Sequence, residues 1–173
     1  MSKTRYPAII FLILIVASLA LPLFYYSRLP DTIATHFNFR NEADGWMSKN
    51  SFFIVEMAVA VLLSGMFFSI AYFVPKFPNS MINLPNKNYW LSAERREESM
   101  NVFQQFIYWL GSLTLGFLTL ISQEVFILNL QGRNKISSSI WIYLFVFLAV
   151  LAFIIIKMVM HFNRTENKNE IKK

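Results

Sequence analysis

Four long apolar runs separated by polar segments form the hydropathy pattern of this chain. The runs cover residues 6–26, 52–74, 102–128 and 140–161. Each reaches the length of about 20 residues that a helix needs to cross the hydrocarbon core of a bilayer. Only Glu56, Glu124 and Lys157 bring formal charges into them. The pattern therefore predicts four transmembrane segments.

Helices are the expected conformation of these segments. Backbone polar groups inside a bilayer must be satisfied within the protein, and a helix does this within one segment. The short alternating segments of a membrane barrel are missing from the pattern. We therefore predict an all-α integral membrane protein, a four-transmembrane-helix bundle that forms a single membrane domain over residues 1–173.

The composition agrees with a membrane protein. Hydrophobic residues make up 55% of the chain and charged residues 15%, whereas soluble domains carry about 25% charged residues. The absence of cysteine excludes disulfides and thiolate sites. The net charge is +6, but the charged residues stand mostly between the apolar runs and form no basic soluble surface. Nucleic acid is therefore not an expected partner, whereas the lipid bilayer is an expected one.

Lysine and arginine predict the orientation. If both termini are cytoplasmic, the cytoplasmic segments hold eleven of these residues and the outer loops five, as the positive-inside rule favours. The expected topology has an outer loop over residues 27–51, a cytoplasmic loop over 75–101 and a cytoplasmic tail over 162–173. The first run resembles a signal peptide, but it exceeds the usual 7–15-residue apolar core, so we expect a retained span.

The outer loop between the first two spans is predicted to be structured. Pro30 can begin a short helix, on which Leu29, Ile33 and Phe37 form one apolar stripe at four-residue spacing. After this helix we expect turns, because their residues tolerate the required backbone angles. The predicted turn residues are Asn38, Asn41, Asp44 and Gly45.

The third span is predicted to extend beyond the membrane. Ser92 can cap a helix with Glu94 in its first turn. A continuous helix over residues 93–128 would be about 54 Å long at 1.5 Å per residue, against a hydrocarbon core of about 30 Å. Two or three turns should therefore project into the cytoplasm. Gly132 is expected to end this helix at the other side.

The two acidic membrane residues are the main candidates for a site. Glu56 lies near the outer start of the second span and Glu124 near the outer end of the third, so both reach the outer leaflet. Charged groups in spans are costly and usually functional. A pocket with His36 and Asp44 is geometrically possible. The alternative is that each glutamate is hydrated or paired with a nearby cation: Arg28, Arg40 or Lys49.

Enzymatic chemistry has little support in the sequence. His36 is the single histidine of the outer side, and no zinc-binding spacing surrounds it. Nucleophile and phosphate-loop motifs are also missing. We therefore predict no catalytic residue, no metal ligand and no cofactor, and a metal-dependent membrane enzyme is the weakest alternative.

The segment "LPDTIATHFNFRNEADGWMSK", residues 29–49, resembles the N-terminal domain of SdpI-like immunity proteins, the domain of unknown function 1648 family. The shared pattern is a proline, His-aromatic-Asn, a glycine, Asp-Gly-aromatic and lysine. It falls on Pro30, His36, Phe37, Asn38, Asp44, Gly45, Trp46 and Lys49. Asn41 takes the usual glycine position, and asparagine also tolerates left-handed backbone. The segment "INLPNKNYWLSAERREE" resembles family members too.

The resemblance implies a multi-pass protein of the bacterial inner membrane. In some relatives it implies immunity to a secreted peptide toxin and signalling of that toxin to a regulator. The additional C-terminal spans of those relatives have no counterpart in this sequence.

The first functional hypothesis is a non-enzymatic protein whose outer loop binds a peptide, a lipid or a protein. The candidate ligand-binding or partner-binding residues are His36, Asn38, Asp44, Trp46, Glu56 and Glu124. A peptide toxin or a partner membrane protein is the expected partner. The alternative is an accessory subunit of a larger membrane complex, because the aromatic-rich spans could pack against another protein.

Overall fold

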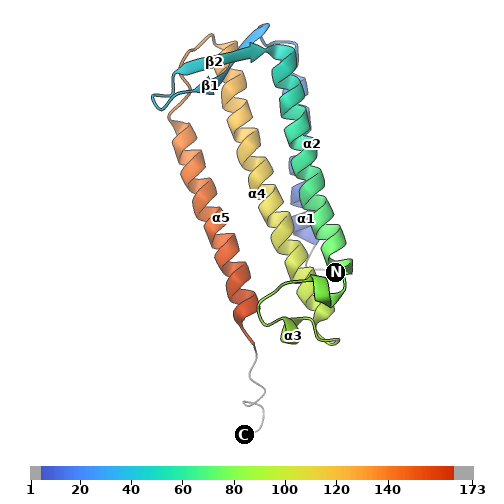
Figure 1. The fold of residues 1–173 in the computed structure, drawn as a ribbon. Coiled ribbons are helices and arrows are strands. Elements are labelled where there is room, and N and C mark those ends of the chain that lie inside the picture. The colour runs from blue at the N-terminus through green and yellow to red at the C-terminus, as the bar shows by residue number, and fades with distance from the viewer. Residues whose placement is uncertain (1–4, 166–173) are drawn as a thin grey trace.

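The computed structural model describes residues 5–165, and these form four long helices with a β-hairpin at one end of the bundle (Figure 1). The long helices are α1 (Arg5–Tyr26), α2 (Lys49–Phe73), α4 (Arg96–Leu130) and α5 (Ser139–Asn163). All four are long and apolar enough to cross a membrane. The four predicted spans are therefore confirmed as helices, and the chain is a multi-pass membrane protein.

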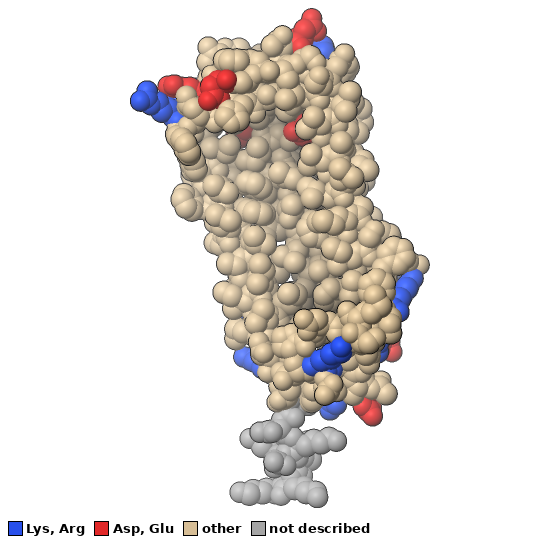
Figure 2. Space-filling model, in the orientation of Figure 1, with Lys and Arg blue, Asp and Glu red and all other residues tan. Residues whose placement is uncertain are grey.

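Charged side chains gather at the two ends of the molecule, and the face between them is almost uniformly uncharged (Figure 2). This band is the surface expected of helices that contact hydrocarbon, where charged groups are costly. The first residues of α1 and the last residues of α5 both lie at the end of the bundle opposite the hairpin (Figure 1). Of the cations that predict the orientation, Lys3, Lys168, Lys172 and Lys173 lie outside the described residues.

Helix α4 is the centre of the bundle, and it packs against α1, α2 and α5. Its most extensive contact is with α1, where the Phe11 side chain is fully buried. A Cβ atom on Gly111 would lie only 2.6 Å from the Phe11 ring, so this helix contact requires a glycine. By contrast, none of the most apolar window of α5 is buried inside the structure.

The segment between α1 and α2 is an antiparallel hairpin of strands β1 (Thr32–Phe37) and β2 (Ala43–Ser48). The prediction of a short helix after Pro30 is therefore wrong, and the fold is mostly helical with one hairpin rather than all-α. The spacing of Ile33 and Phe37 fits a helix and a strand equally well. Residues four positions apart lie on the same side of either element.

Helix α4 provides the physical reason for the strand. Asn129 accepts a hydrogen bond from the Ala34 backbone N–H at 2.8 Å and donates one to the Ala34 carbonyl at 3.0 Å. Its amide thus pairs with β1 as a further strand would. Ile33 is fully buried in a cluster with Phe126 and Leu128 of α4. The hairpin is therefore fixed to the end of the bundle.

The tight turn of the hairpin lies between Asn38 and Glu42. Asn38 Oδ1 accepts hydrogen bonds from the backbone N–H groups of Arg40 and Glu42, and Asn41 adopts a φ of 63°. The prediction that Asn38 and Asn41 form turns is confirmed. Asp44 lies inside β2 instead, so the turn predicted there is wrong.

The hairpin turn also holds the first end of α5. The Asn41 carbonyl accepts a hydrogen bond from Ile136 N–H at 2.9 Å, and Asn41 Oδ1 accepts one from Trp141 Nε1 at 3.2 Å. A third bond runs from Ala43 N–H to the Asn134 carbonyl at 2.8 Å. The two connections at this end of the bundle are therefore joined to each other.

The opposite end of α5 is held by the connection between α2 and α4. This connection contains η1 (Val74–Lys76), η2 (Asn79–Met81) and the short helix α3 (Lys87–Trp90). Asn86 Nδ2 donates to the Phe162 and Asn163 carbonyls at 3.1 and 2.9 Å. Trp90 Nε1 donates to the Phe162 carbonyl at 2.8 Å. These donors satisfy carbonyls that a helix end leaves unpaired.

Helix α4 has 35 residues, close to the predicted 36, but it begins later and ends later than predicted. Ser92 does not cap it, because the Ser92 hydroxyl oxygen is buried without a hydrogen-bond partner. Glu97 and Glu98 stand in the first turn instead. Gly132, with a φ of 61°, follows the end of the helix as predicted.

The role of Asn129 can be tested by Asn129→Ala. This substitution leaves the N–H and the carbonyl of Ala34 unpaired, and a buried unsatisfied group costs about 1–3 kcal/mol. We expect the free energy of unfolding in detergent to fall by about 2 kcal/mol. Gln131→Ala changes an exposed side chain just beyond α4 and is the matched control. Equal losses in both variants would contradict the anchoring role.

Candidate functional site

A contact between His36 and Asp44 marks the irregular part of the hairpin. His36 Nδ1 lies 2.5 Å from Asp44 Oδ1, and both side chains are accessible. The strand register shifts on both sides of His36, which stands opposite Gly45. A Cβ atom on Gly45 would lie 2.8 Å from the His36 Cβ. The glycine therefore permits the close approach that directs both side chains to the same edge.

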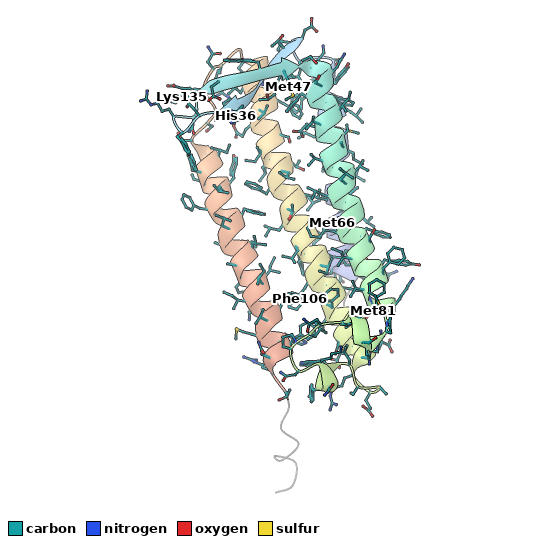
Figure 3. The ribbon with its side chains drawn as sticks, in the orientation of Figure 1. His36, Met47, Met66, Met81, Phe106 and Lys135 are labelled. Carbon is teal, nitrogen blue, oxygen red and sulfur yellow. The ribbon has the colours of Figure 1, made fainter. Side chains whose placement is uncertain are left out.

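A groove of about 650 Å³ begins at this edge and continues between α4 and α5. Figure 3 shows His36 at the hairpin end, between the tops of α4 and α5 in that view. The polar lining comes from the hairpin: His36, Asn38, Asn41 and Asp44. The apolar lining includes Phe117 and Ile121 of α4 and Ile140, Trp141 and Leu144 of α5.

The groove has the characteristics of a ligand site. Pockets for small ligands measure about 300–1,000 Å³ and are mainly apolar with a few polar groups that fix orientation. Here the polar groups stand at one end and the apolar groups extend toward the middle of the bundle. An amphiphilic molecule fits this arrangement, with its polar part at the hairpin and its apolar part between the helices.

A second apolar cavity of about 490 Å³ adjoins the groove. The two share Phe117, and the second one also contacts Leu14, Tyr143 and Phe147. Glu124 belongs to the same α4–α5 interface, where its Oε1 accepts a hydrogen bond from the Tyr143 hydroxyl at 3.2 Å. Open space therefore follows this interface over several helical turns.

Glu56 lies elsewhere, in a small cavity of about 20 Å³ lined by residues of α1, α2 and α4. Its Oε2 accepts a hydrogen bond from the Ser122 hydroxyl at 2.6 Å. Ser122 and Glu124 are two positions apart on α4, a rotation of about 200° at 3.6 residues per turn. The pocket predicted from His36, Asp44, Glu56 and Glu124 is therefore not formed. That pocket follows from the positions of the two glutamates along their helices, whereas the direction of each side chain depends on the rotation of its helix.

Trp46 also lies apart from the groove. Its side chain is 56% exposed and lines a shallow hollow together with Glu42, Arg133 and Lys135. Asn38 lines the groove, but its Oδ1 is already engaged in the turn. Of the six candidate residues, the structure thus brings three to one place: His36, Asn38 and Asp44.

Sequence reasoning missed several residues that shape the site. Trp141 lines the groove and bonds to the turn, Tyr143 bonds to Glu124, and Asn129 positions the hairpin. A polar or amphipathic side chain near the end of an apolar run was the signal available for each. Within residues 5–165, no group of three or more histidine and acidic side chains is arranged to hold a metal ion.

Comparison with known protein families finds a match that includes the hairpin. Residues 13–59 match the family model described as Domain of unknown function (DUF1648). The match covers the second half of α1, the whole hairpin and the first turns of α2. The resemblance of this segment to the domain of unknown function 1648 is thereby confirmed. No curated protein and no solved structure matches the chain.

The steric requirement at Gly45 can be tested by Gly45→Ala. The added methyl would press against His36 and force a backbone shift, which costs about 1–3 kcal/mol. We expect a lower thermal unfolding temperature and a loss of the His36–Asp44 contact in NMR spectra. Gly65→Ala, where nothing lies within 4 Å of the added atom, is the control. An unchanged hairpin in Gly45→Ala would show that this requirement is absent.

Proposed function

We propose that this chain is a non-enzymatic protein of the bacterial inner membrane that binds an amphiphilic ligand at the groove beneath its outer hairpin. The observation that supports the proposal most directly is the groove itself. It joins a polar edge at His36 and Asp44 to an apolar space between α4 and α5. An immunity or signalling role, as in SdpI-like proteins, would follow from capture of a peptide that acts on the membrane.

The polar edge favours a ligand that carries hydrogen-bond donors. Asp44 presents a carboxylate whose side chain is 42% exposed, and a carboxylate accepts strong hydrogen bonds from charged donors. A peptide with an amino group or lysine beside an apolar segment has this chemistry. His36 beside Asp44 would orient that carboxylate. The apolar segment would then displace lipid from Phe117, Trp141 and Leu144.

A second candidate function is that of an accessory subunit in a larger membrane complex. The observation that favours it is the exposure of α5, whose most apolar window has no buried residue. A partner helix could cover that surface, although lipid covers it equally well. Purification in a gentle detergent discriminates the two functions, since an accessory subunit copurifies with its partner in fixed proportion.

The binding proposal can be tested with a photoreactive amino acid at position 144, inside the groove. In cells that hold the ligand, we expect an adduct that is missing from the same probe at position 148, where Leu148 is 47% exposed. Asp44→Asn should reduce this adduct several-fold. Asp31→Asn changes a fully exposed carboxylate of the same connection and should leave it intact.

Mass spectrometry of the adducts distinguishes the outcomes. A distinct peptide or a single enriched lipid at position 144 supports the proposal. The proposal is wrong if both positions capture the same bulk lipids in the same proportions. It is also wrong if the adduct at position 144 is insensitive to Asp44→Asn.

The proposed orientation can be tested by cysteine labelling, because the chain has no cysteine of its own. Phe39 is 96% exposed at the hairpin turn, and Glu97 is exposed at the opposite end. In intact bacterial cells, an impermeant maleimide should label Phe39→Cys and not Glu97→Cys. Permeabilised cells should show both labels. The reverse pattern in intact cells would place the hairpin in the cytoplasm.

A further inference from the structure

The small cavity around Glu56 has a chemistry that the groove does not share. Glu56 is the seventh residue after Lys49, so it lies about 10 Å along α2, inside the apolar band. Among the described residues, its hydrogen-bond partner is the Ser122 hydroxyl, and no basic side chain lines its cavity. An intramembrane carboxylate without a cationic side chain is costly and points to a function.

The Ser122 hydroxyl is the polar partner of this carboxyl group. It donates to Glu56 Oε2 at 2.6 Å, within the ordinary range of O–H···O bonds. A carboxylate at this depth is stabilised by a bound proton or a bound cation. No lysine, arginine or histidine lines the cavity, so either one would come from outside the chain.

Three hydroxyl groups around the cavity each donate their hydrogen bond to another group. Ser18 donates to the Ile15 carbonyl at 2.9 Å, Thr119 to the Leu115 carbonyl at 2.7 Å, and Ser122 to Glu56. The three donating residues all line the cavity. Their oxygens therefore retain only lone pairs, so the hydroxyl lining offers acceptors rather than donors.

Proline in α1 adds a further oxygen. Pro22 lies inside α1 and has no N–H, so the Ser18 carbonyl receives no helical hydrogen bond. Both Pro22 and Ser18 line the cavity. Backbone carbonyls released by interruptions of membrane helices are established ligands for sodium in other membrane proteins. Ser18 and Ser122 each stand eight positions before the hairpin-side ends of their helices, at the same depth.

The size and charge of the cavity select among cations. Its volume of about 20 Å³ is close to that of one water molecule, about 10–15 Å³ by the same measure. One dehydrated small ion fits, and a hydrated ion does not. A single carboxylate supplies one negative charge, which a monovalent ion neutralises completely, whereas a divalent ion would leave an excess positive charge in the apolar band.

We propose that this cavity is a sodium site, in which Glu56, Ser18, Thr119 and Ser122 provide the oxygen ligands. The ion would join α1, α2 and α4 directly beneath the hairpin and would stabilise the bundle at that level. This proposal does not depend on ligand binding at the groove, because the four ligand residues do not line the groove, although Leu118 borders both sites.

Thermal unfolding of the purified full chain in lipid nanodiscs tests the proposal. Sodium chloride should raise the unfolding temperature saturably, by about 3 °C or more, relative to N-methylglucamine chloride at equal ionic strength. Glu56→Gln, which keeps the size and can still accept from Ser122, should abolish this difference. Glu124→Gln alters the other membrane carboxylate and should retain it.

A second variant covers the case in which Glu56→Gln does not fold. Pro22→Ala restores an N–H for the Ser18 carbonyl and leaves the carboxylate in place. It should shift the sodium dependence to several-fold higher concentrations. The proposal is overturned if sodium and N-methylglucamine stabilise the wild-type chain equally, or if Glu56→Gln retains the sodium effect.

Infrared difference spectra between the wild type and Glu56→Gln distinguish sodium from a bound proton. Carboxylate bands that shift when sodium is added support the proposal. A protonated-carboxyl band that sodium does not change would overturn it, because a proton would then be the compensating cation.

Discussion

Hydrogen bonds made by asparagines at the two ends of the bundle hold this fold together. Inside a bilayer the helices satisfy their own backbone, so the difficult positions are the strand and helix ends at the two surfaces. Three asparagines serve these positions. Asn129 pairs with β1 through both its donor and its acceptor, Asn41 binds the start of α5 through its backbone carbonyl and its Oδ1, and the Asn86 amide donates to the end of α5.

The same arrangement explains where open space occurs. Since α5 is bound at both ends, it does not need close packing along its length, and it contacts the bundle mainly through α4. The groove under the hairpin and the cavity beside it lie in this loosely packed interface. Toward α1, Gly111 permits tight packing with Phe11, and the small cavity at Glu56 lies between α1, α2 and α4. Close packing on this side thus leaves a smaller space than the groove.

Much of this could be predicted from local features of the sequence. Run length predicts the four helices, and the left-handed tolerance of asparagine predicts the turn at Asn41. The hairpin was missed because its stabilising partner, Asn129, is distant in the sequence and the spacing of Ile33 and Phe37 fits helix and strand alike. The positions of Glu56 and Glu124 along their helices follow from the sequence, but their partners, Ser122 and Tyr143, depend on how each helix is rotated. The local pattern of apolar and polar residues does not specify which side chains of different helices contact one another.

Helix α5 is positioned mainly by the hydrogen bonds at its two ends. Asn86 has a φ of 50°, so Asn86→Gly removes the amide without straining the backbone. Pulsed electron–electron distance measurements between spin labels at positions 109 and 155, on the exposed sides of α4 and α5, test the claim in nanodiscs. We predict one narrow distance distribution in the parent and a clearly broader one in Asn86→Gly. An unchanged distribution would mean that the α4–α5 interface alone positions the helix, which contradicts the account.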